Sequence, residues 1–214
     1  MDHEAVRAQV LDAAERLFYG RGVHGVGMDD IRDASGISLK RLYGLFPAKE
    51  HLTEAYLERR VARLRQELIV HVEEYEDPDD RILAIFDWLS SRFTDPAYRG
   101  CALINSYGEL GATSDAVAGL ARRHKEWVRK YLRDLVIAAG LPTGLADQLW
   151  ILTEGAMVIA GIFGGQEAAT QARSAAALLL DATRQAARTR VDHQTAETAT
   201  GVAGSEMTVS EQGH

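Results

Sequence analysis

The stretch SGISLKRLYGLFPAKE, residues 35–50, decides the fold. Gly36 breaks one short helix, and Ser38 stands where its hydroxyl can cap the next helix by accepting a backbone N–H bond. Pro47 stops this second helix, since proline lacks the N–H that a helix interior needs. A longer helix then starts near Lys49. A tight turn followed by a short basic helix is typical of the second half of a helix-turn-helix, the unit that lays one helix in a DNA groove.

The helix between the turn and the proline has two different faces. Leu42 and Phe46 are four residues apart, so they share a face that is expected to point inward. Lys40, Arg41 and Tyr43 lie elsewhere on the helix surface. The pattern predicts a helix that is fixed to its domain by two apolar side chains and presents cations and a phenol outward.

The rest of the chain also reads as helical, because apolar residues recur every three or four positions. The helices are expected at residues 4–19, 28–35, 38–45, from 49 past 68, 82–93, 100–110, 117–135, 145–163 and 167–190. The segment 145–163 is apolar nearly all round, which predicts burial on all sides by its own domain or by a second subunit. Residues 195–214 are small and polar, which predicts disorder. The fold class is therefore all-α.

Composition excludes several classes of protein. A single cysteine, Cys101, excludes an internal disulfide framework and fits a reducing cytoplasm. No run of about 18 charge-free apolar residues indicates a membrane span, and the N-terminus lacks the apolar segment of a secretory signal. The seven histidines show no metal spacing. No catalytic set and no cofactor motif is visible, so we expect neither an enzyme nor a metal or cofactor.

Charge is distributed unevenly along the chain. The net charge of −7 does not by itself indicate a nucleic-acid binder. However, residues 32–65 carry eight Lys or Arg against four Asp or Glu, whereas the segment after Arg190 carries four acids and no Lys or Arg. Charge alone does not decide the function, because either imbalance also suits a solvated surface.

The frame around the opening stretch carries a family resemblance. The sequence LDAAERLFYGRGVHGVGMDDIRDASGISLKRLYGLFPAKEHL, residues 11–52, resembles the N-terminal domain of the TetR (tetracycline-repressor) family of bacterial regulators. The similarity extends over residues 4 to about 57, and residues 151–182 look like the family's last two helices. The matching positions are Leu17-Phe18, Gly22, Asp30-Ile31, Ala34, Gly36-Ile37-Ser38, Leu42-Tyr43, Phe46, Lys49 and Leu52.

The resemblance implies the domain organisation and the partners. Residues 1–47 would form a three-helix helix-turn-helix DNA-binding domain, residues 48–191 a larger helical ligand-binding and dimerisation domain, and residues 192–214 a disordered acidic tail. The protein would be a cytoplasmic homodimer joined through its last two helices. It would bind a palindromic DNA operator, and we expect a repressor rather than an activator. A small, largely apolar effector would release it from that operator.

The resemblance also implies roles for single residues. The recognition helix would run from Ser38 to Leu45, with Leu39, Lys40 and Arg41 facing the major groove, where Arg or Lys can bond guanine and Leu can meet a thymine methyl. Tyr43 and Lys49 would hold phosphates, which sets register rather than sequence. Lys40 could equally contact a phosphate.

Four positions depart from the family pattern and leave the operator sequence open. Gly27 replaces the usual Ser or Thr before the second helix, and Arg32 stands where alanine is common. Gly44 in the recognition helix either removes a contact or permits closer approach to DNA. Leu45 replaces a frequent polar residue.

The effector site is expected among aromatic and polar residues of the larger domain, although most of these could instead be core residues. The expected ligand contacts are Phe86, Trp88, Phe93, Cys101, Asn105, Tyr107, Glu109, Trp127, Tyr131, Trp150 and Glu154. Of these, Asn105, Glu109 and Glu154 would supply polar anchors. A mostly apolar pocket with a few polar groups suits a lipophilic or aromatic molecule.

Two alternatives remain open from the sequence. Some TetR-like regulators sense oxidants or electrophiles through a cysteine in a similar Gly-Cys context, and Cys101 follows Gly100; a small buried packing residue is the simpler interpretation. The chain could also be a helical small-molecule-binding protein without DNA function. The intact basic helix argues against that alternative.

Overall fold

The computed structural model describes the backbone of residues 3–206 and the side chains of residues 3–189. Its regular secondary structure within this range is entirely α-helical, which confirms the predicted fold class. The helix ends differ from the predicted ends by a few residues, except in the last helix. The helices are α1 His3–Arg21, α2 Met28–Ser35, α3 Leu39–Leu45, α4 Lys49–Glu73, α5 Pro78–Phe93, α6 Ala102–Leu110, α7 Asp115–Ala138, α8 Gly144–Phe163 and α9 Glu167–Glu206.

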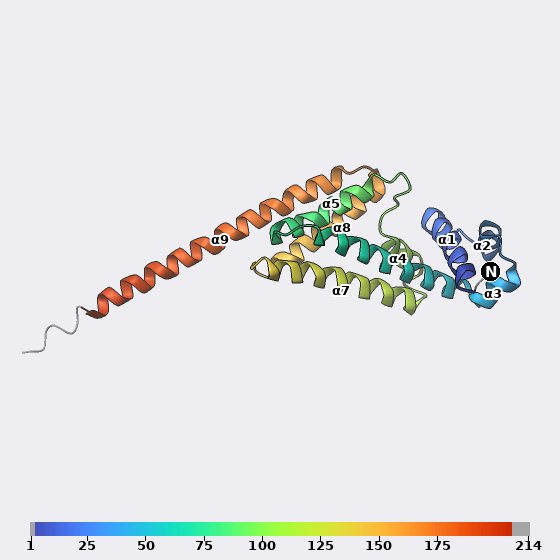
Figure 1. Cartoon of the computed structure of the whole chain (residues 1–214), viewed down its shortest axis with the longest axis horizontal. Coiled ribbons are helices and arrows are strands. Elements are labelled where there is room, and N and C mark those ends of the chain that lie inside the picture. The colour runs from blue at the N-terminus through green and yellow to red at the C-terminus, as the bar shows by residue number, and fades with distance from the viewer. Residues whose placement is uncertain (1–2, 207–214) are drawn as a thin grey trace, which may run out of the picture.

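The first three helices gather at one end of the molecule, and α4 leads from them into the larger helical body (Figure 1). In that body α9 packs on α5 and α8, and α7 packs on α8. The distal part of α9 extends away from the rest, so it and α3 lie at opposite ends of the molecule (Figure 1).

Helix α9 extends beyond residue 190, where the sequence predicted its end. The helix continues to Glu206, through residues 195–206, for which the sequence predicted disorder. The segment contains no proline, and its alanines and glutamates are good helix formers, whereas Gly201 and Gly204 each disfavour the helix. Residues 207–214, the end of the expected acidic tail, lie outside the described residues.

The apolar core around α1–α3 does not stop at the predicted domain boundary between residues 47 and 48. Leu42 and Phe46 of α3 are 0% and 3% exposed and belong to this core. The same core continues into Leu52 of α4, Leu103 of α6 and Val117 of α7. Helices α1–α3 are therefore packed directly on parts of the larger domain. A movement of α4 or α6 would therefore change the position of α3, because the three helices share this core.

Helix α8 is apolar on faces that its own chain does not cover. One face packs against α7 and α9, as shown by the buried Leu149, Ala156 and Ala160. The opposite face is exposed, with Ile162 70% and Phe163 80% accessible. The residues of this exposed stripe are Ile151, Val158, Ile159, Ile162 and Phe163, and Leu178 of α9 is 71% exposed. Burial of α8 on all sides is thus not achieved within the described chain, and its burial by a second subunit stays a prediction.

Length and composition alone would allow α8 to cross a membrane. The core helix of a helical bundle meets the same criterion. Here α8 also carries Asp147, which forms an ion pair with Arg129 at 2.7 Å, and Glu154, which forms one with Lys125 at 2.6 Å. Two ion pairs to α7 fit a helix packed in a bundle, so α8 does not indicate a membrane protein.

Candidate DNA interface and effector cavity

The turn between α2 and α3 has the geometry that a helix-turn-helix requires. Gly36 adopts φ +68°, a left-handed conformation that favours glycine, and its N–H donates to the Arg32 carbonyl at 2.8 Å. This closes the C-terminus of α2. Ile37, 5% exposed, then anchors the turn in the core. The chain can therefore reverse sharply and deliver α3 to the surface.

The starts of α2 and α3 differ from the capping expected from the sequence. The Ser38 side chain makes no cap bond within the described residues, so the prediction of a hydroxyl cap is wrong, and α3 begins with the Leu42 N–H donating to the Ser38 carbonyl at 2.9 Å. Seven residues are too short to be stable alone, so α3 is held by its buried side chains. At α2 the Asp30 carboxylate accepts the Gly27 N–H at 2.8 Å, which replaces part of the missing Ser or Thr cap.

Most of the predicted DNA-contacting residues lie on the outer surface of α3 or directly before it. Lys40, Arg41 and Gly44 are exposed, as is Ser38, and Tyr43 is 47% exposed. The buried face behind them is the one formed by Leu42 and Phe46. Together with its place at the extremity of the molecule (Figure 1), this leaves α3 sterically accessible to a DNA groove.

Two of the predicted DNA contacts are less exposed than the others. Leu39 is partly buried and packs against the N-terminal core, so only part of its side chain is available to a base. Lys49 is also partly buried, at the first position of α4. The contacts that either residue makes with DNA stay predictions.

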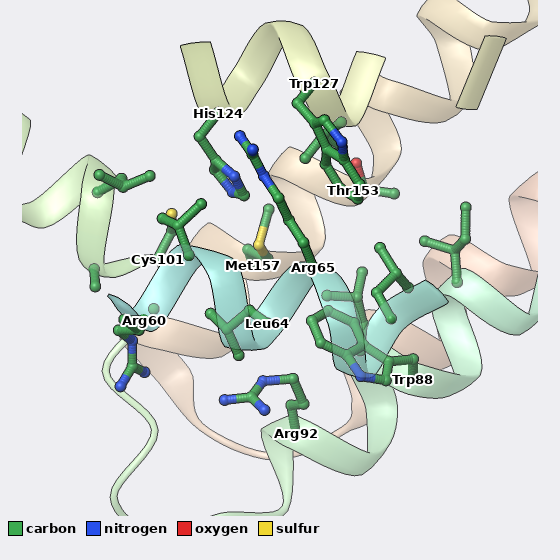
Figure 2. Close-up of a pocket in the computed structure, with 18 of the residues that line it drawn as sticks. Arg60, Leu64, Arg65, Trp88, Arg92, Cys101, His124, Trp127, Thr153 and Met157 are labelled. Atoms are coloured by element: carbon green, nitrogen blue, oxygen red, sulfur yellow. The ribbon is translucent and has the colours of Figure 1, made fainter. Parts of the chain in front are cut away.

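A cavity of about 90 Å³ lies beside α4 in the larger domain. Its walls come from α4, α5, α7, α8 and the turn before α6, and its lining is mostly aliphatic and aromatic. Four of the predicted ligand contacts line it, namely Trp88, Phe93, Cys101 and Trp127. Residues that the sequence analysis missed also line it, and Figure 2 labels the polar and sulfur-bearing ones: Arg60, Arg65, Arg92, His124, Thr153 and Met157.

Four predicted aromatic contacts lie outside the cavity lining, namely Phe86, Tyr107, Tyr131 and Trp150. Phe86 is completely buried in the second core, formed by α5, α7, α8 and α9. Tyr131 stacks on the side chain of Trp127, with ring centroids 5.2 Å apart, and so supports a lining residue from behind. Tyr107 is 48% exposed on α6. Helical spacing placed these side chains on α5, α6, α7 and α8 but did not distinguish core, cavity and surface.

The predicted polar anchors serve structural contacts instead of lining the cavity. Glu154 accepts hydrogen bonds from Lys125 Nζ at 2.6 Å and from Trp150 Nε1 at 3.1 Å, so the Trp150 side chain is held outside the lining as well. The Asn105 amide donates to the Arg99 carbonyl at 2.8 Å. The Glu109 carboxylate accepts the His24 N–H at 2.7 Å.

Among the residues that the structure describes, those that line the cavity include three arginines and no carboxylate. Arg60 pairs with Glu15 at 2.6 Å, and Arg92 pairs with Glu67 at 3.0 Å. Both of these acids lie outside the lining. Burial lowers the pKa of His124 to about 3, with a further contribution from the charges of Lys125 and Arg65, so its imidazole is neutral at physiological pH.

The missed arginines had a recognisable signal. Arg60 follows Leu57 by three residues, Arg65 follows Val61 by four, and Arg92 follows Leu89 by three. Each therefore lies on the apolar face of its helix, where a solvated cation is not expected.

The cavity wall is connected directly to α1. Arg60 is a lining residue of the cavity, and its guanidinium bonds Glu15 of α1 and lies 3.9 Å from the ring centroid of Tyr19. Arg63 of α4 also bonds Glu15, at 2.5 Å. Burial raises the pKa of Glu15, but the hydrogen bonds and charges of Arg63 and Arg60 outweigh this and hold the pKa below its usual value. Glu15 is therefore ionised at neutral pH, and α1 and α4 are joined by a charged cluster.

The turn before α6 is connected to the same cluster. The Tyr19 hydroxyl donates to the Gly100 carbonyl and accepts the Arg99 N–H, each at 2.8 Å. Gly100 adopts φ +84°, and a Cβ added at Gly161 of α8 would come within 3.0 Å of the Gly100 Cα. The turn thus packs backbone against backbone on α8. Because Gly100 and Cys101 also line the cavity, the turn connects the cavity lining to Tyr19 of α1.

The chain resembles known regulators in sequence and in fold. Residues 10–56 match the sequence profile described as bacterial regulatory proteins, tetR family. An uncharacterised HTH-type transcriptional regulator of Mycobacterium tuberculosis is 30% identical over 156 residues, which cover 64% of this chain and 77% of the relative. The HTH-type transcriptional activator FasR of Mycolicibacterium smegmatis is 37% identical over 87 residues, 39% of this chain and 40% of FasR.

Solved structures agree over most of the described chain. A TetR-family transcriptional regulator from Streptomyces coelicolor superposes with a TM-score of 0.78 at 23% identity, over 84% of this chain and 96% of that one. A TetR regulator from Streptomyces avermitilis gives 0.73 at 28% identity, over 84% and 98%. Helix-turn-helix geometry, sequence profile and curated relatives agree, and the chain belongs to the TetR family of helix-turn-helix transcriptional regulators.

Proposed function

We propose that this regulator is a homodimeric, cytoplasmic repressor that binds a palindromic operator and is released by a small, largely apolar effector. The observation that carries the proposal is the position of Arg60, which lines the cavity and is bonded to α1 of the DNA-binding end. One side chain thus belongs to both the effector site and the DNA-binding machinery.

The proposed operator contacts follow from the surface of α3. Lys40 and Arg41 read bases or phosphates in the major groove, and Tyr43 and Lys49 hold phosphates. Two such helices in a two-fold dimer engage half-sites about 34–36 Å apart, so the operator is palindromic. The exposure of Lys40, Arg41 and Tyr43 supports this assignment.

The proposed dimer forms through α8 and α9. The apolar stripe of α8 is exposed in the single chain, and Leu178 of the next helix, α9, is exposed as well. Contiguous apolar surface of this kind marks an interface. A two-fold axis would pack the stripe on its own copy and bury it on both sides.

The proposed response to the effector rests on the size and connections of the cavity. Ligand pockets for molecules of ordinary size measure about 300–1,000 Å³, whereas this cavity measures about 90 Å³. An effector that needs a pocket of the ordinary volume therefore requires the lining of this smaller cavity to move. Arg60 and the turn at Gly100 are lining groups bonded to α1, so their displacement shifts α1 and, through the shared core, α3. The effector must bind the displaced arrangement better, which favours the form that does not fit the operator.

A two-stage experiment tests this function. Fragments that the purified protein retains from random DNA are sequenced, and compounds are then screened for release of the selected fragment. We expect a two-fold symmetric sequence and a release that requires a compound. The FasR relative is named as an activator, so a reporter gene behind the selected sequence decides the sign of regulation. Retained fragments without a shared sequence would contradict the proposal.

Cysteine-based sensing is a second candidate function, because Cys101 lines the cavity and accepts a contact from Lys125 Nζ at 3.7 Å. A nearby cation favours a reactive thiolate. However, the same ammonium is paired with Glu154 at 2.6 Å, which neutralises most of its effect. Cys101→Ser should therefore keep the normal response. Loss of an oxidant-induced response in that variant would favour the second function.

A further inference from the structure

Of the three arginines that line the cavity, Arg65 differs from the other two in its charge partners among the described residues. Arg60 and Arg92 each face a carboxylate, Glu15 and Glu67 respectively. Arg65, in contrast, forms no ion pair within the part of the chain that the structure describes. Its hydrogen bond is a long one to the Arg123 carbonyl, 3.4 Å, and its Nε is buried without a hydrogen-bond partner there.

The surroundings of Arg65 are apolar. Its guanidinium lies 4.7 Å from the ring centroid of Trp127, and Figure 2 shows it rising from α4 between His124 and Trp127. Burial alone lowers the pKa of Arg65, yet an arginine stays protonated. Glu58 and Glu126 line the outer groove between α4 and α7, on which Arg65 also borders, but neither lines the cavity. The charge is therefore partly desolvated and lacks a counter-ion inside.

A hydrogen-bond donor stands next to this charge. The imidazole of His124 is neutral, lines the cavity, and has Nδ1 buried without a partner in the described residues. A neutral imidazole can donate from one ring nitrogen. Arg65 and His124 together therefore offer a fork of N–H donors at one end of a cavity whose other walls, such as Leu64 and Met157, are apolar.

This arrangement selects among classes of ligand. A cationic molecule would meet three arginines and no carboxylate in the lining, and like charges in an apolar site repel strongly. A neutral apolar molecule would fill the space but leave the Arg65 charge and the His124 nitrogen unsatisfied. A carboxylate bonds a guanidinium in a forked, charge-assisted geometry and satisfies both groups.

We propose that the effector is an apolar acid, an aliphatic or aromatic body that ends in a carboxylate, and that Arg65 binds the carboxylate with His124 as a second donor. The inference deepens the proposed function by naming the chemical class of the effector. The walls formed by Trp88, Leu89, Phe93 and Val128 would hold the body. The site is the cavity itself, so binding can be measured without DNA.

Matched probes test the proposal by calorimetry on the full chain at constant salt and pH 7.5. The aliphatic set is octanoate, 1-octanol and octylammonium; the aromatic pair is 2-naphthoate and 2-naphthalenemethanol. At least one acid should bind about 10-fold or more tightly than its alcohol, the range expected of a charge-assisted hydrogen bond. Octylammonium should bind weakest. The set that shows the larger effect identifies the body as aliphatic or aromatic.

Arg65→Gln should reduce the affinity for the acid to that of the alcohol, and should change the affinity for the alcohol by less than about two-fold. Arg65→Lys, which keeps a cation but loses the fork, should retain part of the preference for the acid. Arg123→Gln is the matched control, since Arg123 borders the outer groove but not the cavity. It should leave all affinities unchanged, and thermal melts check that each variant folds.

Three results would overturn the proposal: equal affinity of acid and alcohol in the wild type, a preference for the acid that survives Arg65→Gln, or no measurable binding of either acid. Release of the selected operator is measured separately. An acid that binds through Arg65 without releasing DNA contradicts the proposed function and leaves the site intact. Release by a neutral compound, with no preference for acids, contradicts the site and leaves the function intact.

Discussion

Ile162→Asp should separate the proposed dimer without unfolding the subunit. Ile162 is 70% exposed in the single chain and lies in the apolar stripe of α8. Because most of its side chain contacts no other part of its own chain, the substitution costs the fold of the subunit little. In the dimer the same side chain would be buried against the second copy.

The magnitude follows from the exposed fraction. Complete burial of an isoleucine side chain contributes about 1.5–3 kcal/mol, so burial of the 70% that is exposed contributes about 1–2 kcal/mol. Two-fold symmetry places two copies in the interface, which gives about 2–4 kcal/mol. At about 1.4 kcal/mol for each factor of ten, the dimer dissociation constant should rise about 30- to 1,000-fold. The cost of desolvating the new carboxylate adds to this.

Sedimentation velocity over a range of protein concentrations measures the dissociation constant. Val70→Asp is a suitable control, because Val70 is 49% exposed but lies on α4, outside α8 and α9. It should leave the dimer intact. An unchanged dissociation constant in Ile162→Asp, or an equal effect of Val70→Asp, would refute the assignment of the interface to α8.

Further predictions concern pH, salt and the cavity. In the folded state the imidazole of His124 stays neutral down to a pKa of about 3. An unfolded histidine takes up a proton near pH 6.5, so protonation favours the unfolded state as the pH falls. The contribution of the neutral imidazole to the free energy of unfolding is therefore fully present above pH 6.5 and decreases below it. Between pH 8 and pH 5 the wild type should lose about 2 kcal/mol more than His124→Gln in chemical denaturation; parallel curves would contradict the burial of a neutral imidazole. Lys49→Ala should weaken binding to all DNA sequences alike and reduce the slope of log K against log salt by about 1. A sequence-specific loss would instead place Lys49 at a base.

The sequence predicted the helix-turn-helix more closely than the effector site, for a physical reason. Local rules predict the inward orientation of Leu42 and Phe46, because helical spacing decides which side chains share a face. They also predict the turn at Gly36, because a left-handed backbone conformation favours glycine. These rules need no knowledge of distant contacts. The prediction of a hydroxyl cap at Ser38 was wrong because the cap bond depends on a side-chain rotamer that spacing does not specify.

The cavity depends on contacts between distant helices. Spacing correctly placed Trp88 and Trp127 on inward faces, but it could not separate them from Phe86, which is core, or Trp150, which is bonded to Glu154. The spacing of Arg65 from Val61 indicates the apolar face of α4, but it does not say which side chains Arg65 meets there. Only the packing of α7 against α4 turns it toward His124 and Trp127 (Figure 2).

The direct test of the central claim is the DNA-binding isotherm of Lys40→Ala/Arg41→Ala on the selected operator and on a scrambled sequence at the same salt. We expect the double variant to stay a dimer with an unchanged thermal melt, because both residues lie on the exposed face of α3. We expect its preference for the operator over the scrambled DNA to disappear, since groups that read bases are gone. An operator preference equal to that of the wild type would contradict base reading by α3.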